Sequence, residues 1–313
     1  MSRDVSQFGA ETTAEEVLED LDLGGKTILI TGASSGLGAQ SARALAGRGA
    51  TLVLTARQLA KVEGVAAEIR ESSGNANVSV MRLELTDWPG VRRFAADFVA
   101  AHPKLDILIN NAGVMGCPLT RTADAIEMQF ASNHLGHFLL TNGLRPALEA
   151  AAPSRIVAVS SAGHRISPVL FDDPGFERTA YDKWIAYGQS KTANVLHAVA
   201  LDARLQERGV RAFAIHPGAI MTELGRHLKA EDLDLLNAMS PSGAMEFKSV
   251  GAGAATQVFA ATAPELDGRG GVYLEDCHVA ETNPGDGMEG VRPYAIDPAN
   301  AERLWELSES LLS

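Results

Sequence analysis

Short apolar runs recur along the chain and alternate with stretches in which apolar residues fall three or four positions apart. Uninterrupted apolar runs are typical of strands buried on both faces, and the wider spacing is typical of helices. The expected strands are 27–30, 51–55, 78–83, 105–109, 155–159, 210–215 and 271–274. The expected helices include 39–47, one beginning at Trp88, 123–148, 187–207, 251–261 and 298–312. This alternation predicts an α/β fold in one domain, with a seven-stranded, doubly wound parallel sheet.

The first expected strand leads into a glycine-rich turn and then a helix, within residues 26–47. Gly32 permits a tight turn after the strand, Gly36 lets the backbone approach a pyrophosphate, and Gly38 lets the helix pack close to the sheet. The N-terminus of that helix would offer unpaired N–H groups to phosphate oxygens. This order predicts a dinucleotide-binding βαβ unit, whereas a glycine cluster alone would also fit an ordinary loop.

The second expected strand ends near Arg57, 25 positions after Gly32 (57 − 32). In NAD-binding folds an acidic residue often stands at this point and binds the ribose 2′-hydroxyl. A guanidinium can instead pair with a 2′-phosphate, which a carboxylate would repel. We therefore expect NADP(H) as the cofactor. NAD(H) is the alternative if Arg57 is only a solvated residue at the start of the next helix.

Composition and charge narrow the classes of partner. The 313 residues are 46% hydrophobic and 21% charged, and the net charge is −12 with no run of lysine and arginine. Nucleic acid and anionic membranes are therefore poor partners. No apolar run approaches the roughly 20 residues of a membrane span. The two cysteines offer no disulfide framework, so we expect a cytoplasmic protein.

The N-terminus divides from the rest of the chain at the first expected strand. Residues 1–25 form an acidic arm, with a short helix whose cap is Thr12 or Thr13. We expect this arm to dock on the surface. Residues 26–313 form the dinucleotide-binding domain with a C-terminal tail, and no linker-like shift in composition divides them.

Polar residues follow several expected strands, at the edge of a parallel sheet where ligands bind. The fifth strand ends at Ser160 and Ser161, and Tyr187 and Lys191, four positions apart (191 − 187), share one helix face. A tyrosine is a poor base at its free pKa of about 10, but a nearby lysine ammonium favours the phenolate. The pair therefore fits proton transfer at a substrate oxygen, although such pairs often lie merely on a helix surface.

The long helix expected over 123–148 carries Asn133, His134 and His137. The two histidines share a helix face because they are three positions apart. Since the sequence places no third ligand nearby, we expect these histidines to pack in the core, and we expect no metal site. Asn133 is a polar residue in a section that otherwise faces the core, which indicates a functional role.

Four motifs stand in a fixed order: TGxxxGxG at 31–38, NNAG at 110–113, YxxxK at 187–191, and Pro217 with Gly218. Together they resemble the single-domain branch of the short-chain dehydrogenase/reductase family, over about residues 26–274. Segments 133–138, 159–161 and 275–277 further resemble the retinol dehydrogenase and WW-domain-containing oxidoreductase group. The resemblance implies a Rossmann fold and hydride transfer between NAD(P) and an alcohol or carbonyl compound.

The family pattern implies a catalytic set of Asn133, Ser161, Tyr187 and Lys191. Tyr187 would be the general acid or base, Ser161 would donate to the substrate oxygen, with Ser160 as the alternative, and Asn133 would hold a water that connects Lys191 to solvent. Lys191 would also bind the nicotinamide ribose. The implied cofactor contacts are Gly32, Ser34, Ser35, Gly36, Leu37, Gly38, Arg57, Glu84, Leu85, Asn111, Ala112, Gly113, Tyr187, Lys191, Pro217, Gly218, Ile220 and Thr222.

The sequence departs from the family pattern at two places. Glu84 stands where the family usually has aspartate beside the adenine, which puts that contact in doubt. Ser161 and Tyr187 are 26 positions apart (187 − 161), about twice the common spacing, so we expect the added loop 165–183 to border the substrate pocket. Its apolar wall would comprise Val169, Leu170, Phe171, Phe176 and Trp184. The loop leaves open whether the chain forms a tetramer, a dimer or no homo-oligomer.

The predicted function is hydride transfer between NADP(H) and a bulky hydrophobic alcohol, ketone or aldehyde. A non-catalytic dinucleotide-binding sensor or scaffold on the same fold is the main alternative, although it would not need Ser161, Tyr187 and Lys191. An epimerase or dehydratase acting on nucleotide sugars is disfavoured by the glycine spacing and the short C-terminal region. The glycine- and proline-rich segment 276–297 is expected to close over the pocket.

Overall fold

A computed structural model describes residues 5–239, 245–285, 287 and 289–313. Its centre is one sheet with the strand order β3-β2-β1-β4-β5-β6-β7-β8. The strands are β1 (Thr27–Thr31), β2 (Thr51–Ala56), β3 (Val78–Arg82), β4 (Ile107–Asn110), β5 (Ser154–Val159), β6 (Val210–His216), β7 (Val272–Glu275) and β8 (His278–Val279). The first seven pair in parallel, so the expected α/β fold class is confirmed.

The expected number of strands was wrong, because the sheet has eight and the last pair is antiparallel. β8 has only two residues, and a two-residue turn joins it to β7. Asp276 and Cys277 in that turn have positive φ angles of 48° and 61°. Positive φ at both central residues is the geometry that matches the twist of a tight hairpin. So short a strand has no periodicity of its own in the sequence.

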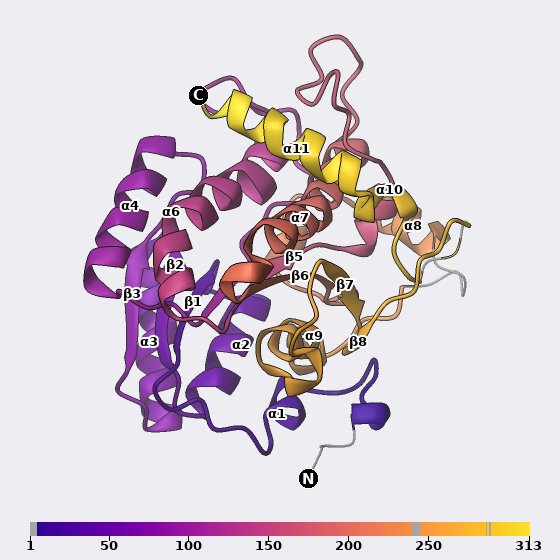
Figure 1. The fold of residues 1–313 in the computed structure, drawn as a ribbon. Coiled ribbons are helices and arrows are strands. Elements are labelled where there is room, and N and C mark those ends of the chain that lie inside the picture. Colours follow the sequence, from indigo (N-terminus) through magenta and orange to yellow (C-terminus); the bar gives the residue numbers. More distant parts are fainter. Residues whose placement is uncertain (1–4, 240–244, 286, 288) are drawn as a thin grey trace.

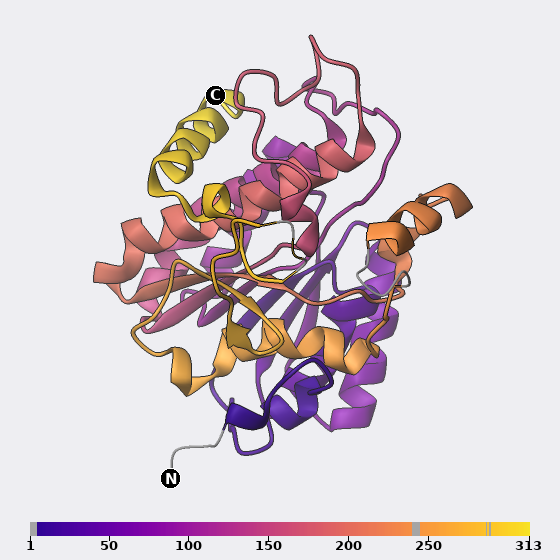
Figure 2. The same ribbon diagram turned by 90° about the vertical axis from the view of Figure 1, so that its right-hand side faces the viewer.

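Helices cover both faces of the sheet, as the two views in Figure 1 and Figure 2 show. One face is covered by α4 (Trp88–Ala101), α6 (Gly136–Ala150), α7 (Lys183–Leu205) and α11 (Pro298–Leu311). The other is covered by α1 (Ala14–Val17), α2 (Gly36–Ala46), α3 (Leu59–Ser73) and α9 (Val250–Thr262). The apolar side chains form two separate cores, one on each side of the sheet, as a strand buried on both faces requires.

The N-terminal arm packs against the domain through α1, which lies on α9 and α2. Thr13 caps α1, and Glu16 returns its carboxylate to the Thr13 backbone N–H at 2.7 Å. Phe8 adds an edge-on contact with the ring of Phe259, at 6.2 Å between centroids. The short helix therefore has both a cap and a buried face.

Two expected helix boundaries differ from the structure. The helix expected from residue 123 begins at Met128, and it consists of α5 (Met128–Phe130), a π-helical turn (Ala131–Leu135) and α6. The helix expected to open at Tyr187 begins one turn earlier, because Asp182 caps the N–H groups of Trp184 and Ile185. Tyr187 therefore lies inside α7, where the helix fixes its direction.

His134 and His137 are fully buried, in agreement with the expected packing role. His134 meets the Ser308 hydroxyl of α11 at 2.7 Å and the ring of His197 at 5.4 Å between centroids. His197 also packs against Phe138. The part of the chain that the structure describes contains no group of three or more side chains arranged to hold a metal ion.

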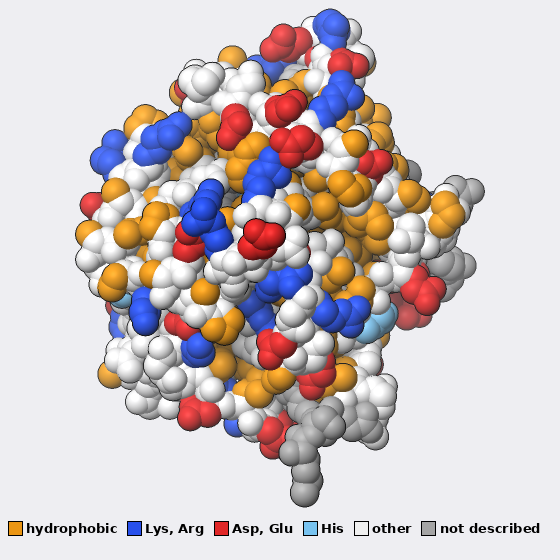
Figure 3. Space-filling view, viewed as in Figure 1, with side chains coloured by type: hydrophobic (Ala, Val, Ile, Leu, Met, Phe, Trp, Pro, Cys, Tyr) orange, Lys and Arg blue, Asp and Glu red, His pale blue; other side chains and the backbone are white. Residues whose placement is uncertain are grey.

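The surface view in Figure 3 shows basic and acidic side chains interspersed over one face of the molecule. No continuous basic patch forms on that face. Among the described residues, no helix combines the length and the apolar character needed to cross a bilayer.

Replacing Gly38 should destabilise the protein, because a Cβ there would lie 2.5 Å from the Gly32 carbonyl oxygen and 2.6 Å from Asn111 Nδ2. We expect Gly38→Ala to lower the free energy of unfolding by about 1–3 kcal/mol. Gly64, inside α3, has no atom within 4 Å of its Cβ position, so Gly64→Ala should raise that free energy by about 0.5–1 kcal/mol. Denaturant unfolding measures both, and equal stability of the two variants would contradict the close packing of α2.

The buried histidines should make the fold sensitive to acid. Burial lowers the pKa of His137 to about 4 and that of His197 to about 3. Below about pH 6.5 these histidines are protonated in the unfolded chain but remain neutral in the folded chain. The free energy of unfolding therefore falls as the pH drops toward 4. His197→Leu should reduce this slope by up to about 1.4 kcal/mol per pH unit, measured by denaturant unfolding between pH 4 and 6. An unchanged slope would show that His197 is protonated in the folded state.

Candidate active site

A cavity of about 1050 Å³ opens at the carboxyl ends of the parallel strands. It lies beside the point where the strand order reverses, between β1 and β4, where ligands bind in doubly wound sheets. Of the predicted catalytic residues, it is lined by Ser161, Tyr187 and Lys191. Of the predicted cofactor residues, all except Gly38 line it: Gly32, Ser34, Ser35, Gly36, Leu37, Arg57, Glu84, Leu85, Asn111, Ala112, Gly113, Tyr187, Lys191, Pro217, Gly218, Ile220 and Thr222.

The glycine-rich turn has the shape that a dinucleotide phosphate requires. Gly32 has a φ of +68°, and a Cβ there would lie 2.8 Å from the Cα of Ala112. Ser35 precedes the first residue of α2, yet its side chain makes no capping hydrogen bond to the helix. Helix N-terminal N–H groups that no side chain caps are suited to bind phosphate oxygens, so these residues fit a dinucleotide cofactor.

Gly38 and Asn133 are the predicted site residues that do not line the cavity. Gly38 acts one layer behind it, where it lets α2 approach the Gly32 carbonyl and the Asn111 side chain. Asn133 is fully buried. Its Oδ1 accepts the Val114 N–H at 2.8 Å, and its Nδ2 donates to the Val114 carbonyl and to Ser190 Oγ, both at 2.9 Å. Asn133 therefore fixes the chain that follows the NNAG turn.

The hydroxyl of Thr31 joins three parts of the site. Its oxygen accepts the N–H groups of Asn111 at 2.9 Å and Ala112 at 3.0 Å, and it lies 2.9 Å from His137 Nε2. Since that oxygen already accepts twice, its own proton is left to donate to His137. His137 Nδ1 lies 3.0 Å from the Asn133 carbonyl oxygen and so carries the ring proton. Burial lowers the pKa of His137 to about 4, which agrees with a neutral ring.

Tyr187, Ser161 and Lys191 converge at the cavity. Ser161 and Tyr187 both lie against Gly163, where a Cβ would be 3.4 Å from Ser161 Oγ and 2.7 Å from Tyr187 Cε1, and Lys191 Nζ lies 5.7 Å from the Tyr187 ring centre. Lys191 Nζ donates to the Val159 carbonyl at 2.9 Å. Burial raises the pKa of Tyr187 to about 12 and lowers that of Lys191 to about 8. Without a ligand the phenol is protonated at neutral pH, so it can donate a proton.

Ser160 and Ser161 occupy different environments. The Ser160 hydroxyl is buried and donates to the Lys191 carbonyl at 2.7 Å, which ties the end of β5 to α7. The Ser161 hydroxyl accepts the Gly163 N–H at 3.0 Å, so it starts the 3₁₀ turn Ala162–Arg165. The Ser161 hydroxyl acts to lower the pKa of the Tyr187 phenol, against the larger opposite effect of burial.

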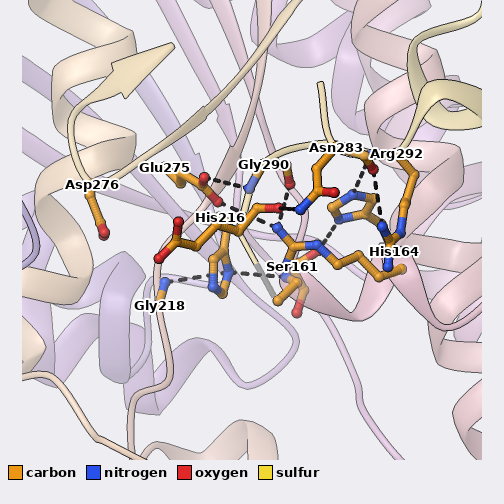
Figure 4. Close-up of polar contacts among 12 residues, drawn as sticks. Ser161, His164, His216, Gly218, Glu275, Asp276, Asn283, Gly290 and Arg292 are labelled. Carbon is orange, nitrogen blue, oxygen red and sulfur yellow. Dashed lines mark hydrogen bonds and ion pairs between the residues drawn. The ribbon is translucent and has the colours of Figure 1, made fainter. Parts of the chain in front are cut away.

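His216 was not predicted as a site residue, although it precedes the Pro217 and Gly218 motif. Its Nδ1 accepts the N–H of Ala162 at 3.1 Å and that of Gly218 at 3.4 Å. Figure 4 shows the ring between Gly218 and the Ser161 turn. Burial lowers the pKa of His216 to about 3, so the ring remains a neutral acceptor. Its position directly after the expected strand 210–215 was the available sequence signal, and the structure makes it the last residue of β6.

The far end of the cavity carries positive and negative groups together. Arg57, Gln58 and Lys61 line it beside Glu84 and Leu85. The Arg57 side chain is 63% exposed, and its Nε lies 3.9 Å from a Glu84 oxygen. The other Glu84 oxygen accepts the Thr86 hydroxyl at 3.0 Å. Arg57 is thus free to turn toward a ligand.

The expected apolar wall was mostly wrong. Of its residues only Trp184 lines the cavity, whereas Val169 and Phe176 are buried and Phe171 packs against the core. The apolar lining comes instead from segments after the NNAG and Pro217–Gly218 turns and from α8 (Ala230–Met239). It comprises Met115, Met128, Ile166, Leu224, Leu228, Leu233, Leu236, Met245 and Phe247. Leucines three apart in α8 were the sequence signal for this wall.

The family comparisons cover most of the chain. The profile of the short chain dehydrogenase family matches residues 26–233. The chain is 42% identical over 293 residues to retinol dehydrogenase 12 of Homo sapiens, over 94% of this chain and 88% of that protein. It is similar to the crystal structure of an uncharacterised protein from Mycobacterium paratuberculosis, with a TM-score of 0.73 and 34% identity over 96% and 97% of the two chains. The structure of a gluconate 5-dehydrogenase from Burkholderia cenocepacia, in complex with NADP and tartrate, matches with a TM-score of 0.64 and 26% identity. The match covers 81% of this chain and 94% of that chain.

Proposed function

The chain belongs to the short-chain dehydrogenase/reductase family and is an NAD(P)-dependent oxidoreductase that acts on CH–OH groups, and we propose that it reduces a hydrophobic ketone or aldehyde with NADPH. The observation that carries this proposal is the placement of Ser161 and Tyr187 against Gly163 at the cavity, with Lys191 one helical turn further along α7. A dinucleotide sensor on the same fold has no need for a buried phenol and ammonium beside a serine.

The cofactor supplies the hydride when it is bound. The Tyr187 hydroxyl then donates its proton to the substrate oxygen, and the Ser161 hydroxyl stabilises the charge that develops there. The Lys191 ammonium favours the phenolate left on Tyr187. Asn133 holds the Val114 backbone, so it positions the segment that borders the nicotinamide side of the cavity.

The protonation of Tyr187 fits its role as the proton donor in carbonyl reduction at neutral pH. Its pKa of about 12 keeps the proton that reduction consumes. Alcohol oxidation needs the phenolate, so it should accelerate as the pH rises. Lys191, with a pKa of about 8, loses its positive charge over the same range and limits that gain.

The substrate end of the cavity supports a hydrophobic substrate, because leucines, methionines and Phe247 line it. The similarity to a retinol dehydrogenase supports the same class, since retinol is an apolar alcohol. NADP is named in the structure of the gluconate 5-dehydrogenase, and Arg57 and Lys61, which line this cavity, supply cations for a 2′-phosphate. A cytoplasmic location and a homo-oligomer remain part of the proposal.

Replacing Tyr187 with phenylalanine tests the reaction. Tyr187→Phe removes the proton donor, so we expect kcat for carbonyl reduction to fall by about 10²-fold or more, with NADPH affinity nearly unchanged. Tyr273→Phe is the matched control, because this tyrosine is also buried and its hydroxyl has no hydrogen-bond partner among the described residues. Steady-state kinetics and a fluorescence titration of NADPH measure the two effects. Substantial turnover by Tyr187→Phe would overturn the assignment of Tyr187.

Replacing Arg57 with alanine tests the cofactor preference. We expect NADPH to bind the native protein at least about tenfold more tightly than NADH, a difference of about 1.4 kcal/mol, and Arg57→Ala to remove that difference. Arg93→Ala is the control, since Arg93 is also exposed and also lies 3.9 Å from a carboxylate. If NADH binds the native protein equally well, Arg57 does not bind a 2′-phosphate and NAD(H) is the cofactor.

A further inference from the structure

Two arginines that the proposed chemistry does not use line the cavity near Ser161. Arg165 ends the 3₁₀ turn that begins after Ser161, and Arg292 precedes α10 (Pro293–Ile296). They are distant in sequence, but His164 links them, because its Nδ1 meets the Ser161 carbonyl at 2.7 Å and its Nε2 accepts the Arg292 N–H at 3.2 Å. Figure 4 shows this chain of contacts from Ser161 through His164 to Arg292.

The guanidinium of Arg165 is buried but only partly satisfied. Its side chain is 5% exposed, and Nη2 donates to the Gly290 carbonyl. Nε and Nη1 have no hydrogen-bond partner among the described residues. A buried donor without an acceptor costs stability. Nε and Nη1 lie on opposite edges of the guanidinium, so each can donate a separate hydrogen bond, whereas the fork of Nε and Nη2 is already occupied on Nη2 by Gly290. The structure therefore has a pair of unused single donors beside the cavity wall.

The acidic residues near Arg165 do not satisfy that donor pair. The closest Glu275 oxygen is 3.7 Å from Arg165 Nη2, and the other accepts the Gly290 N–H at 2.7 Å. Glu289 also acts on Arg165 electrostatically, whereas Asp276 is paired with Lys248. Glu275 and Glu289 are not among the residues that line the cavity, so they lie behind the arginine. Glu275 and Arg165 both bind Gly290, and so hold this part of the C-terminal segment against the site.

Arg292 is held so that part of its guanidinium stays available. Its backbone N–H donates to His164, and its Nη1 donates to the Asn283 carbonyl at 3.0 Å. Nε and Nη2 have no partner among the described residues. Of the segment 276–297, which we expected to close over the pocket, Arg292 is the one described residue that reaches the cavity. Residues 286 and 288 lie outside the described part of the chain.

The charges that line this end of the cavity have one sign. Arg165 and Arg292 contribute cations, whereas the acidic lining residues, Glu84 and Glu223, lie by the adenosine end and near the phosphate turn. The protein as a whole carries a net charge of −12. A local positive wall in an acidic protein favours anions at that wall.

We propose that Arg165 and Arg292 form a subsite for a carboxylate of the substrate. The substrate is then an aldehyde or ketone with an apolar body and a carboxylate at a distance from the reacting carbon. In the reaction the carbonyl carbon accepts a hydride from NADPH and its oxygen accepts a proton, which yields a hydroxy acid and NADP⁺, while the carboxylate is unchanged. The inference rests on the proposed function. It adds a second group, the carboxylate, by which the protein recognises its substrate.

A series of ω-oxo carboxylic acids and their methyl esters tests this subsite. We expect kcat/KM of the native protein to be at least about tenfold higher for the acid of best length than for its ester, because charge-assisted hydrogen bonds are lost in the ester. Arg292→Gln should remove this preference by lowering kcat/KM for the acid while that for the ester is kept. Arg292→Lys should retain part of it, since the charge remains but the fork is lost.

Arg208→Gln is the control for net charge, because Arg208 follows the distant end of α7 and pairs with Glu149 on the surface. It should keep the full preference for the acid. Equal turnover of acid and ester by the native protein would overturn the proposal. An equal loss of both substrates in Arg292→Gln would also overturn it, since that pattern indicates a structural role.

If no member of the series is reduced, the proposed function fails, and a binding measurement then tests the subsite alone. Calorimetric titration of a saturated, unreactive fatty carboxylate into the protein with NADP⁺ should show binding that Arg292→Gln weakens about tenfold or more and Arg208→Gln does not. The same affinity in the native protein and in Arg292→Gln would overturn the subsite independently of turnover.

Discussion

The hydroxyl of Thr31 is the contact on which the rest of the site depends. It stands at the end of β1 and accepts the N–H groups of Asn111 and Ala112, which directly follow β4, so it sets the spacing of two strands at the cavity. Through His137 the same hydroxyl reaches the Asn133 carbonyl, and through the Asn133 side chain it reaches Val114. A buried network with every member satisfied has one arrangement, because any slip leaves a polar group without a partner. The glycine turn and the segment beside Lys191 are thereby held in one register.

The parts of the fold that the sequence predicted are those with strong local patterns. Parallel strands buried on both faces appear as apolar runs, and motifs at their ends mark the residues that reach the cavity. β8 was not predicted because two residues carry no periodicity. The π-helical turn was not predicted because the residue pattern of Ala131–Leu135 resembles that of the helices on either side of it. Asn133 was identified by its polarity in a core-facing section, although its contacts with Val114 and Ser190 depend on chain segments that the sequence does not place together.

The substrate end was the least predictable part, because segments distant in the sequence build it. Val169 and Phe176 looked like wall residues since they are apolar and lie in an inserted loop, but the loop turns them toward the protein interior. The wall comes instead from several segments, among them α8, which an ion pair between Lys183 and Asp232 ties to the start of α7. Arg165 and Arg292 reach the cavity only through contacts of the C-terminal segment. The sequence does not indicate which surface a charged residue on a loop will face.

The packing of the C-terminal helix has a consequence for how the protein is made. α11 lies along α7 and places Ala301, Leu304 and Ser308 in the same core, while Arg292 stands just before it at the cavity. A ribosome releases these residues long after Tyr187 and Lys191. Until they emerge, α7 has an apolar face without its cover, and His134 lacks the Ser308 hydroxyl. During synthesis the dinucleotide-binding half can assemble first. The substrate half cannot take its final form until α11 has emerged from the ribosome.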